Sequence, residues 1–155
     1  MMARVHVELK QSRPFARPES EAFVGLLRTA AMLDHAANEA LKPYGLTQTQ
    51  YNVLRILRGA GSSGLCGREV GERLIARVPD VPRLLDRMVE ARLISRERDS
   101  TDRRHVTARI TPDGLQLLDR VTPILEELES RWFSGLEPQK LEALIEALDA
   151  MRDHA

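Results

Sequence analysis

The stretch LISRERDSTDRRHVTARITPDG, residues 93–114, decides the fold of this chain. After Leu93 the side chains alternate in character at every second position, first over residues 94–99 and again over residues 106–110, which is typical of β-strands. The segment Ser100-Thr101-Asp102-Arg103-Arg104 lies between the two strands. The stretch therefore predicts a β-hairpin with a charged tip.

Helices are expected on the C-terminal side of the hairpin. Thr111 can cap a helix, and Pro112 suits the first helical position, where the amide has no helical partner. Apolar residues then recur at helical spacing over residues 115–132, until a glycine and a proline interrupt the pattern. A last amphipathic helix is expected over about residues 141–151.

Two short helices are expected on the N-terminal side of the hairpin. The first spans about residues 67–76, and Gly71 inside it indicates the close approach of a neighbouring helix. The second has Asp80 as its cap. Its apolar side chains recur at helical spacing: Val81, Leu84, Leu85, Met88 and Val89. Arg83 and Arg87 are then left on its outer side, one turn apart.

Two further helices are expected before this region. One begins at Thr47, which forms a capping box with Gln50, and ends near Leu57. The other runs from a cap at Ser20 to about Leu41. Both carry an apolar stripe on one face, so each is expected to pack against other elements.

An N-terminal arm, residues 1–18, is expected to precede these helices. The alternation of Val5, Val7 and Leu9 favours a short extended piece, and the prolines of the arm stop any helix. The whole chain has 155 residues, of which 43% are hydrophobic and 30% charged. This length and composition fit one globular domain with a real core.

The composition also excludes several classes of protein. No run of about 18 apolar residues occurs, so no membrane span is expected. An apolar leading segment is lacking as well, which favours a cytoplasmic protein. One cysteine, Cys66, excludes an internal disulfide, and the histidines lack helical metal-ligand spacing. We therefore expect no metal and no cofactor.

The charge is balanced in total but uneven along the chain. Residues 1–111 carry a net charge of +6, and residues 112–155 carry −6. Arginine supplies 20 of the 23 basic residues, and its guanidinium suits bidentate contacts with phosphate and guanine. The N-terminal part is therefore the part that we expect to face an anion.

The order of short helix, turn, amphipathic helix and hairpin describes a helix-turn-helix followed by a wing. An α-helix fits the major groove of duplex DNA, so Arg83 and Arg87 are expected to contact DNA. A tip that carries Arg103 and Arg104 can reach a neighbouring minor groove, whose negative potential attracts arginine. The sequence predicts a mainly α-helical, double-stranded-DNA-binding protein with a small β-wing.

From Leu46 to Gly114 the chain resembles the multiple-antibiotic-resistance regulator (MarR) family of winged-helix transcription factors. The most specific match is the wing, residues 98–104, followed by Ile110-Thr111-Pro112-Asp113-Gly114. Weaker matches include residues 83–88, and the number and length of the outer helices extend the resemblance over about residues 20–151.

The resemblance implies one domain over residues 19–155. Its winged helix-turn-helix would span about residues 46–111, and its dimerisation helices about residues 19–42 and 112–152. Family members are homodimers that read a pseudo-palindrome, as twofold symmetry requires. Many are repressors that small phenolic or other anionic ligands, or cysteine oxidation, release from DNA.

Further roles follow residue by residue from the resemblance. The wing aspartate of the family positions the wing arginine for the minor groove, which gives these roles to Asp102 and Arg104. The chain departs from the family pattern at Pro79 and Pro82, where Ser or Thr often contacts phosphate; proline has no amide donor. Gly71 also replaces the more usual alanine.

An effector site between the dimerisation helices and the DNA-binding lobe is implied as well. His35, Tyr51 and Arg55 are its candidate residues, and a role at an interface is the alternative for His35. Cys66 lies near a helix start, which favours a thiolate, so it is either a redox sensor or a small residue at a cap.

A DNA-binding regulator has two rival interpretations, an enzyme and a protein-interaction module. The sequence has no G-x-S-x-G motif and no glycine-rich phosphate loop, and its paired carboxylates lie on regular helices, so we expect no enzyme. The alternative is a winged-helix protein-interaction module without specific DNA binding. Weak dependence of DNA binding on salt would favour it, because phosphate contacts release counterions.

Overall fold

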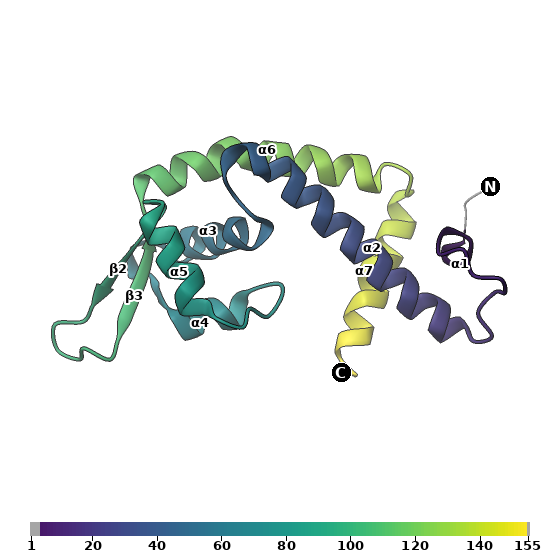
Figure 1. Cartoon of the computed structure of the whole chain (residues 1–155), viewed down its shortest axis with the longest axis horizontal. Helices are drawn as coiled ribbons and strands as arrows, with labels where there is room; N and C mark the ends of the chain where they lie inside the picture. Colours follow the sequence, from purple (N-terminus) through teal and green to yellow (C-terminus); the bar gives the residue numbers. More distant parts are fainter. Residues whose placement is uncertain (1–3, 155) are drawn as a thin grey trace.

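A long helix, α6 (Pro112–Phe133), runs along the molecule and joins its two parts (Figure 1). The structure is a computed structural model that describes residues 4–154. One part, the winged lobe, consists of α3 (Gln48–Ala60), β1 (Leu65–Cys66), α4 (Gly67–Arg73), α5 (Val81–Glu90), β2 (Ile94–Arg98) and β3 (Val106–Ile110). The outer helices are α1 (Val5–Glu8), α2 (Pro18–Leu41) and α7 (Pro138–Arg152). Short 3₁₀ turns, Lys42–Tyr44 and Gly61–Ser63, flank α3.

The buried core is centred on α3. Val53, Leu54 and Leu57 on this helix are fully buried. They form one cluster with Leu85 and Met88 of α5, with the C-terminal end of α2 and with the middle of α6. The mainly helical fold with a small β-wing is therefore confirmed, and the winged lobe is packed directly onto α6.

The start of α3 has the predicted geometry. The Oγ1 atom of Thr47 accepts a hydrogen bond from the backbone N of Gln50 at 3.1 Å, and the Oε1 atom of Gln50 accepts one from the backbone N of Thr47 at 3.0 Å. This reciprocal pair is a capping box. The helix continues to Ala60, three residues beyond the predicted end at Leu57, until the glycine-rich segment stops it.

The start of α2 corrects the sequence prediction. The helix begins at Pro18, with Arg17 as its cap, so Ser20 is not the cap. Proline was expected to stop a helix here, but its missing amide costs nothing in a first turn, where no helical acceptor is available. Pro18 therefore begins the helix that it was expected to exclude.

The expected extended piece of the N-terminal arm is also wrong. Val5, Val7 and Glu8 lie in the short helix α1. This helix packs against α2, where the side chain of Glu8 approaches Arg28 at 4.0 Å. Packing on a neighbouring helix has overridden the two-residue alternation of a very short segment. Residues 1–3 of the predicted arm lie outside the described residues.

The helix α4 is shorter than predicted, because it ends at Arg73 instead of near residue 76. Leu74 is extended, and the backbone N of Ile75 donates to the Oδ1 atom of Asn52 at 2.9 Å. The close approach predicted at Gly71 is confirmed, because a Cβ atom there would lie 3.2 Å from Val81 on α5. A side chain at this position would require Val81 to shift by a few tenths of an ångström.

The predicted hairpin is confirmed, and it gains a third strand. β2 and β3 pair antiparallel, with Ile94 opposite Ile110 and Arg98 opposite Val106. β1 pairs with the other edge of β3, which the sequence analysis did not predict. Gly64 just before β1 has φ +65°, and a Cβ atom there would lie 2.5 Å from the carbonyl oxygen of Ala108. Only glycine fits this approach of two strands.

The junction between the hairpin and α6 explains the threonine and glycine of the Ile-Thr-Pro-Asp-Gly segment. The Oγ1 atom of Thr111 donates to the carbonyl oxygen of Arg92 at 2.7 Å and accepts from the backbone N of Gly114 at 3.0 Å. A Cβ atom on Gly114 would overlap the carbonyl oxygen of Leu93. Both residues thus fix the start of α6 against the beginning of the wing.

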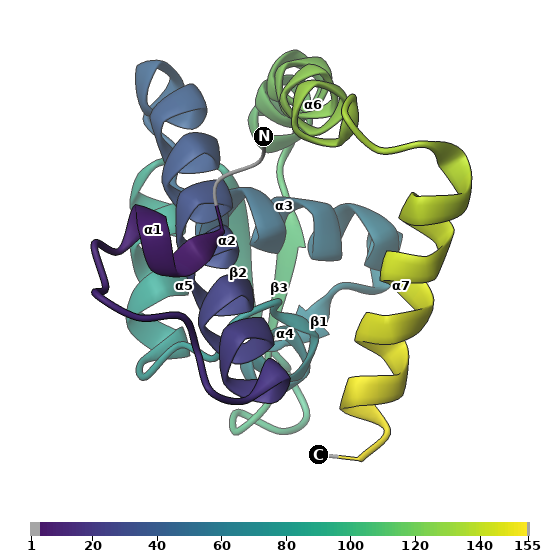
Figure 2. The same cartoon turned by 90° about the vertical axis from the view of Figure 1, so that its right-hand side faces the viewer.

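The helix α7 differs from all elements of the winged lobe. It contains no buried residue, although apolar side chains recur along it. Figure 2 shows α6 at the top, α7 below it on the right and α2 on the left. Among the described residues, no helix combines the length and the apolar character that crossing a bilayer requires.

Candidate nucleic-acid interface

The helix α5 presents two arginines to solvent. Its first turn is held by Asp80, whose Oδ1 atom accepts a hydrogen bond from the backbone N of Arg83 at 3.0 Å. Leu85 and Met88 are fully buried against the lobe. Because helix geometry places the opposite side outward, both Arg83 and Arg87 are exposed. The predicted cap and the predicted outer face of this helix are confirmed.

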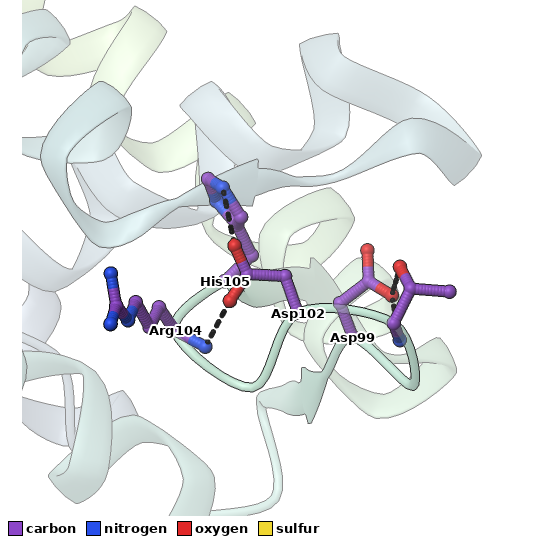
Figure 3. A network of polar contacts seen from close by, with 5 residues as sticks. Asp99, Asp102, Arg104 and His105 are labelled. Carbon is purple, nitrogen blue, oxygen red and sulfur yellow. Dashed lines mark hydrogen bonds and ion pairs between the residues drawn. The ribbon is translucent and has the colours of Figure 1, made fainter.

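The tip of the wing is shaped by Asp99. Its Oδ1 atom accepts hydrogen bonds from the backbone N of Thr101 at 2.8 Å and from the Thr101 hydroxyl at 2.7 Å (Figure 3). These bonds favour the ionised carboxylate and hold the pKa of Asp99 below its ordinary value. The backbone N of Asp99 also donates to the carbonyl oxygen of His105 at 2.9 Å, which closes the base of the loop.

Asp102 positions Arg104 through the main chain. The Oδ1 atom of Asp102 accepts a hydrogen bond from the backbone N of Arg104 at 3.0 Å, while the guanidinium of Arg104 points away from the carboxylate (Figure 3). The Oδ2 atom lies 3.7 Å from the Nε2 atom of His105. The sequence analysis did not single out His105, although it follows the arginine pair directly.

The base of the wing is tied to α5 by an ion pair. The Nη1 atom of Arg96 on β2 lies 2.5 Å from the Oδ1 atom of Asp86 on α5. On the neighbouring strand, Arg109 donates to the carbonyl oxygen of Ser62 at 2.8 Å and to the Glu97 carboxylate at 3.3 Å. Sequence analysis assigned none of these residues a role. For Arg96 the sequence did contain a signal, because Arg96 lies on the same face of its strand as Ile94, which is buried.

The predicted contact residues share one electrostatic property. The side chains of Arg83, Arg87, Arg103 and Arg104 are all exposed, and none of them forms an ion pair within residues 4–154. Their charge is therefore available to an anionic partner. They lie on two separate elements, the outer side of α5 and the tip of the wing (Figure 1).

Cys66 caps α4. The Oε2 atom of Glu69 accepts a hydrogen bond from the backbone N of Cys66 at 2.8 Å, and the cysteine side chain faces the backbone N of Glu69 in return. The bond from the Cys66 amide, helped by one from its side chain, holds the pKa of Glu69 below its ordinary value. The structure thus places Cys66 at the cap of α4.

A cavity of about 340 Å³ lies between α2 and α6. Its apolar wall is formed by Leu33, Ala37, Leu125, Leu128, Trp132 and Phe133. The residues predicted for an effector site do not line it. His35 is exposed on α2, Tyr51 is buried with its hydroxyl 3.5 Å from Thr122, and the Arg55 guanidinium lies 5.9 Å from the centre of the Tyr51 ring.

Comparison with known proteins identifies the family. The MarR family profile matches residues 44–105. The uncharacterized HTH-type transcriptional regulator YkoM of Bacillus subtilis (strain 168) is 30% identical over 91% of this chain and 93% of its own. The MepR–DNA complex of S. aureus superposes with a TM-score of 0.76 at 25% identity, over 84% of this chain and 96% of MepR.

A third similar protein is Bordetella bronchiseptica BpsR, whose structure concerns the regulation of its DNA binding by 6-hydroxynicotinic acid. It superposes with a TM-score of 0.78 at 25% identity, over 91% of this chain and 99% of BpsR. The family match lies on the winged lobe, and the similar proteins extend over the outer helices as well. The chain therefore belongs to the MarR family of transcriptional regulators, which are DNA-binding winged-helix proteins and not enzymes.

Proposed function

We propose that the protein is a ligand-responsive repressor that binds a pseudo-palindromic operator as a homodimer. The observation that carries this proposal is the set of exposed arginines on α5 and on the wing that form no ion pair with the described residues 4–154. In the proposed complex, Arg83 and Arg87 contact the major groove, and Arg104 enters the neighbouring minor groove. Arg103 contacts phosphate, and Asp102 holds the tip in shape.

The proposed dimer is supported by apolar side chains that the single chain leaves exposed. Phe23 and Leu27 on α2 are 64% and 58% exposed, and Ile145 and Met151 on α7 are 52% and 53% exposed. Exposed apolar surface of this kind marks an interaction site. A second copy related by a twofold axis would cover these faces and present two winged lobes to two half-sites.

Repression would follow from occlusion of a promoter by the bound dimer. An effector would act by binding preferentially to a state in which the two winged lobes no longer match the spacing of the half-sites. The cavity between α2 and α6 is the proposed effector site. In the single chain the residues first predicted for this role, His35, Tyr51 and Arg55, lie outside it.

The proposal is tested by replacing Arg104 with alanine and measuring binding to a selected operator over a range of salt concentrations. Loss of a groove contact is expected to cost about 1–3 kcal/mol, and loss of a phosphate contact by Arg103→Ala is expected to lower the salt slope by about 1. The matched control is Arg131→Ala, because Arg131 is exposed on α6 outside the winged lobe. Wild-type affinity in Arg104→Ala would contradict the wing contact, and weak salt dependence would then favour the protein-interaction alternative.

A further inference from the structure

We infer that the cavity between α2 and α6 binds a protonated apolar amine, so that its ligand is a cation and not an anion. This inference names the effector class for the proposed function and rests on that function only for its regulatory consequence. Binding itself needs no DNA. It also departs from the anionic ligands that the family resemblance implied.

The size and the walls of the cavity suit a small organic molecule. Its volume is about 340 Å³, which lies within the usual range of about 300–1,000 Å³ for ligand pockets. Leu125 and Leu128 of α6 and Leu33 of α2 supply apolar wall. Trp132 and Phe133 are half-buried at the end of α6 and add aromatic surface.

The charged groups at the cavity all have the same sign. Asp34 and Glu129 belong to its lining, and neither forms an ion pair within the described part of the chain. No lysine, arginine or histidine is among the described lining residues. An anionic ligand would meet two like charges here, whereas a cation would meet two opposite ones. The aromatic rings also attract a cation.

Gln48 provides a separate observation. Its Oε1 atom is buried and accepts no hydrogen bond in the described structure. The backbone N of the same residue is already bonded, because it donates to the Oδ1 atom of Asn38 at 2.9 Å. A buried acceptor without a donor is unfavourable, and an ammonium group has donors but no acceptor. Gln48 thus favours an amine over a carboxylate or a quaternary ammonium ion.

One lining residue connects the cavity to the DNA-binding helix. Ile75 lies in the turn between α4 and α5 and is one of the residues that line the cavity. It is also 80% exposed. Its backbone N is held by the Oδ1 atom of Asn52 at 2.9 Å. A ligand that contacts Ile75 therefore contacts the segment that leads into α5. Through this contact, occupancy of the cavity would bias the position of the recognition helix.

The inference is tested with three probes that share one apolar body: 4-phenylbutylamine, the neutral 4-phenylbutan-1-ol and the anionic 4-phenylbutyrate. Trp132 is the only tryptophan of the chain and lines the cavity, so its fluorescence reports binding directly. The amine is expected to give a saturable change and to bind about tenfold more tightly than the alcohol, with the acid weaker than both.

Isosteric variants assign the preference to the two carboxylates. The double variant Asp34→Asn, Glu129→Gln is expected to weaken amine binding about tenfold, to the level of the alcohol, and to leave alcohol binding unchanged. The control is Glu126→Gln with Glu127→Gln, exposed positions of α6 that are not part of the cavity lining. Equal binding of acid and amine, an amine preference that survives the double variant, or no saturable signal would each overturn the inference.

Operator binding is measured separately, with and without the amine. A protein that binds the amine but no operator supports the inference and contradicts the proposed function. A protein that binds the operator but not the amine does the opposite. The regulatory consequence holds if the amine lowers operator affinity in the wild type and not in the double variant.

Discussion

The winged lobe and helix α7 use the same apolar periodicity with opposite results. In the lobe, the stripes of α3 and α5 are largely covered within one chain: Leu54, Leu57, Leu85 and Met88 are fully buried, and of the α5 stripe only Val89 is exposed, at 37%. In α7 two residues of the stripe, Ile145 and Met151, are exposed, and no residue of the helix is buried. An amphipathic pattern therefore establishes that a helix needs a partner, but not whether the partner belongs to the same chain.

The largest expected effect breaks this comparison at α7. Replacing both Ile145 and Met151 with glutamate puts charges on the face that is proposed to pair with a second copy. The dissociation constant of the dimer is expected to rise about a thousandfold or more, because each subunit loses two buried apolar side chains. Sedimentation velocity measures this change, and circular dichroism checks that the winged lobe stays folded.

The matched control adds similar charge to the polar side of the same helix, with Gln139→Glu and Lys140→Glu, both exposed. This variant should keep the assembly state of the wild type. Unchanged assembly in the Ile145 and Met151 variant would show that α7 is not part of a dimer interface.

A smaller effect is expected inside the winged lobe, at its junction with α6. In Gly114→Ala the new Cβ atom would overlap the carbonyl oxygen of Leu93, which belongs to the backbone and cannot rotate away. The free energy of unfolding is expected to fall by about 3 kcal/mol. Gly135→Ala serves as control, because a Cβ atom there meets nothing within 4 Å. Equal stability of the two variants in urea denaturation would contradict the close contact.

Arg92 offers a gain in stability at the end of α5. It has φ 61°, and the backbone bonds from Arg92 to Val89 at 2.9 Å and from Leu93 to Met88 at 3.0 Å form a Schellman motif, in which glycine is the usual residue. Arg92→Gly keeps the carbonyl that Thr111 needs and removes the strain. An increase of about 0.5–1 kcal/mol is expected in urea denaturation, whereas a loss of stability would assign the arginine side chain a structural role.

The smallest expected effect concerns the pKa of Asp99 at the tip of the wing. The pKa of Asp99 is lower in the folded protein than in the unfolded chain, so the folded state binds fewer protons. The contribution of this carboxylate is therefore complete above its ordinary pKa and is lost as the pH falls through the lower folded value. NMR titration of the wild type should show this low pKa. Thr101→Ala should raise it by removing the hydroxyl donor, and an unchanged value would contradict the bond.

The elements with local signals were the ones that the sequence predicted well. Thr47 with Gln50, Asp80 and Thr111 mark helix starts through bonds to residues three positions away, so their caps were visible before the structure. The strand β1 has only two residues and depends on β3, more than forty positions along the chain, so no local pattern indicated it. Pro18 was interpreted as a stop because its position within the helix was unknown.

The candidate site shows the same division. The exposed arginines of α5 and the wing followed from periodicity and from the charged tip. The Asp86–Arg96 ion pair, the backbone contact of Asp102 and the cavity between α2 and α6 depend on how distant segments meet. The family resemblance supplied His35, Tyr51 and Arg55 as effector residues, but it carried no information on the charges that line the cavity of this chain.

The central claim is that two copies of this chain read DNA through α5 and the wing. Selection from a pool of random duplexes by the purified protein at physiological salt tests it most directly. The account predicts recovery of a pseudo-palindrome whose half-sites lie about one helical turn apart, which is 10–10.5 base pairs. Recovery of no enriched sequence by folded protein would contradict it, because the arginines would then serve non-specific binding or the wing would contact a protein.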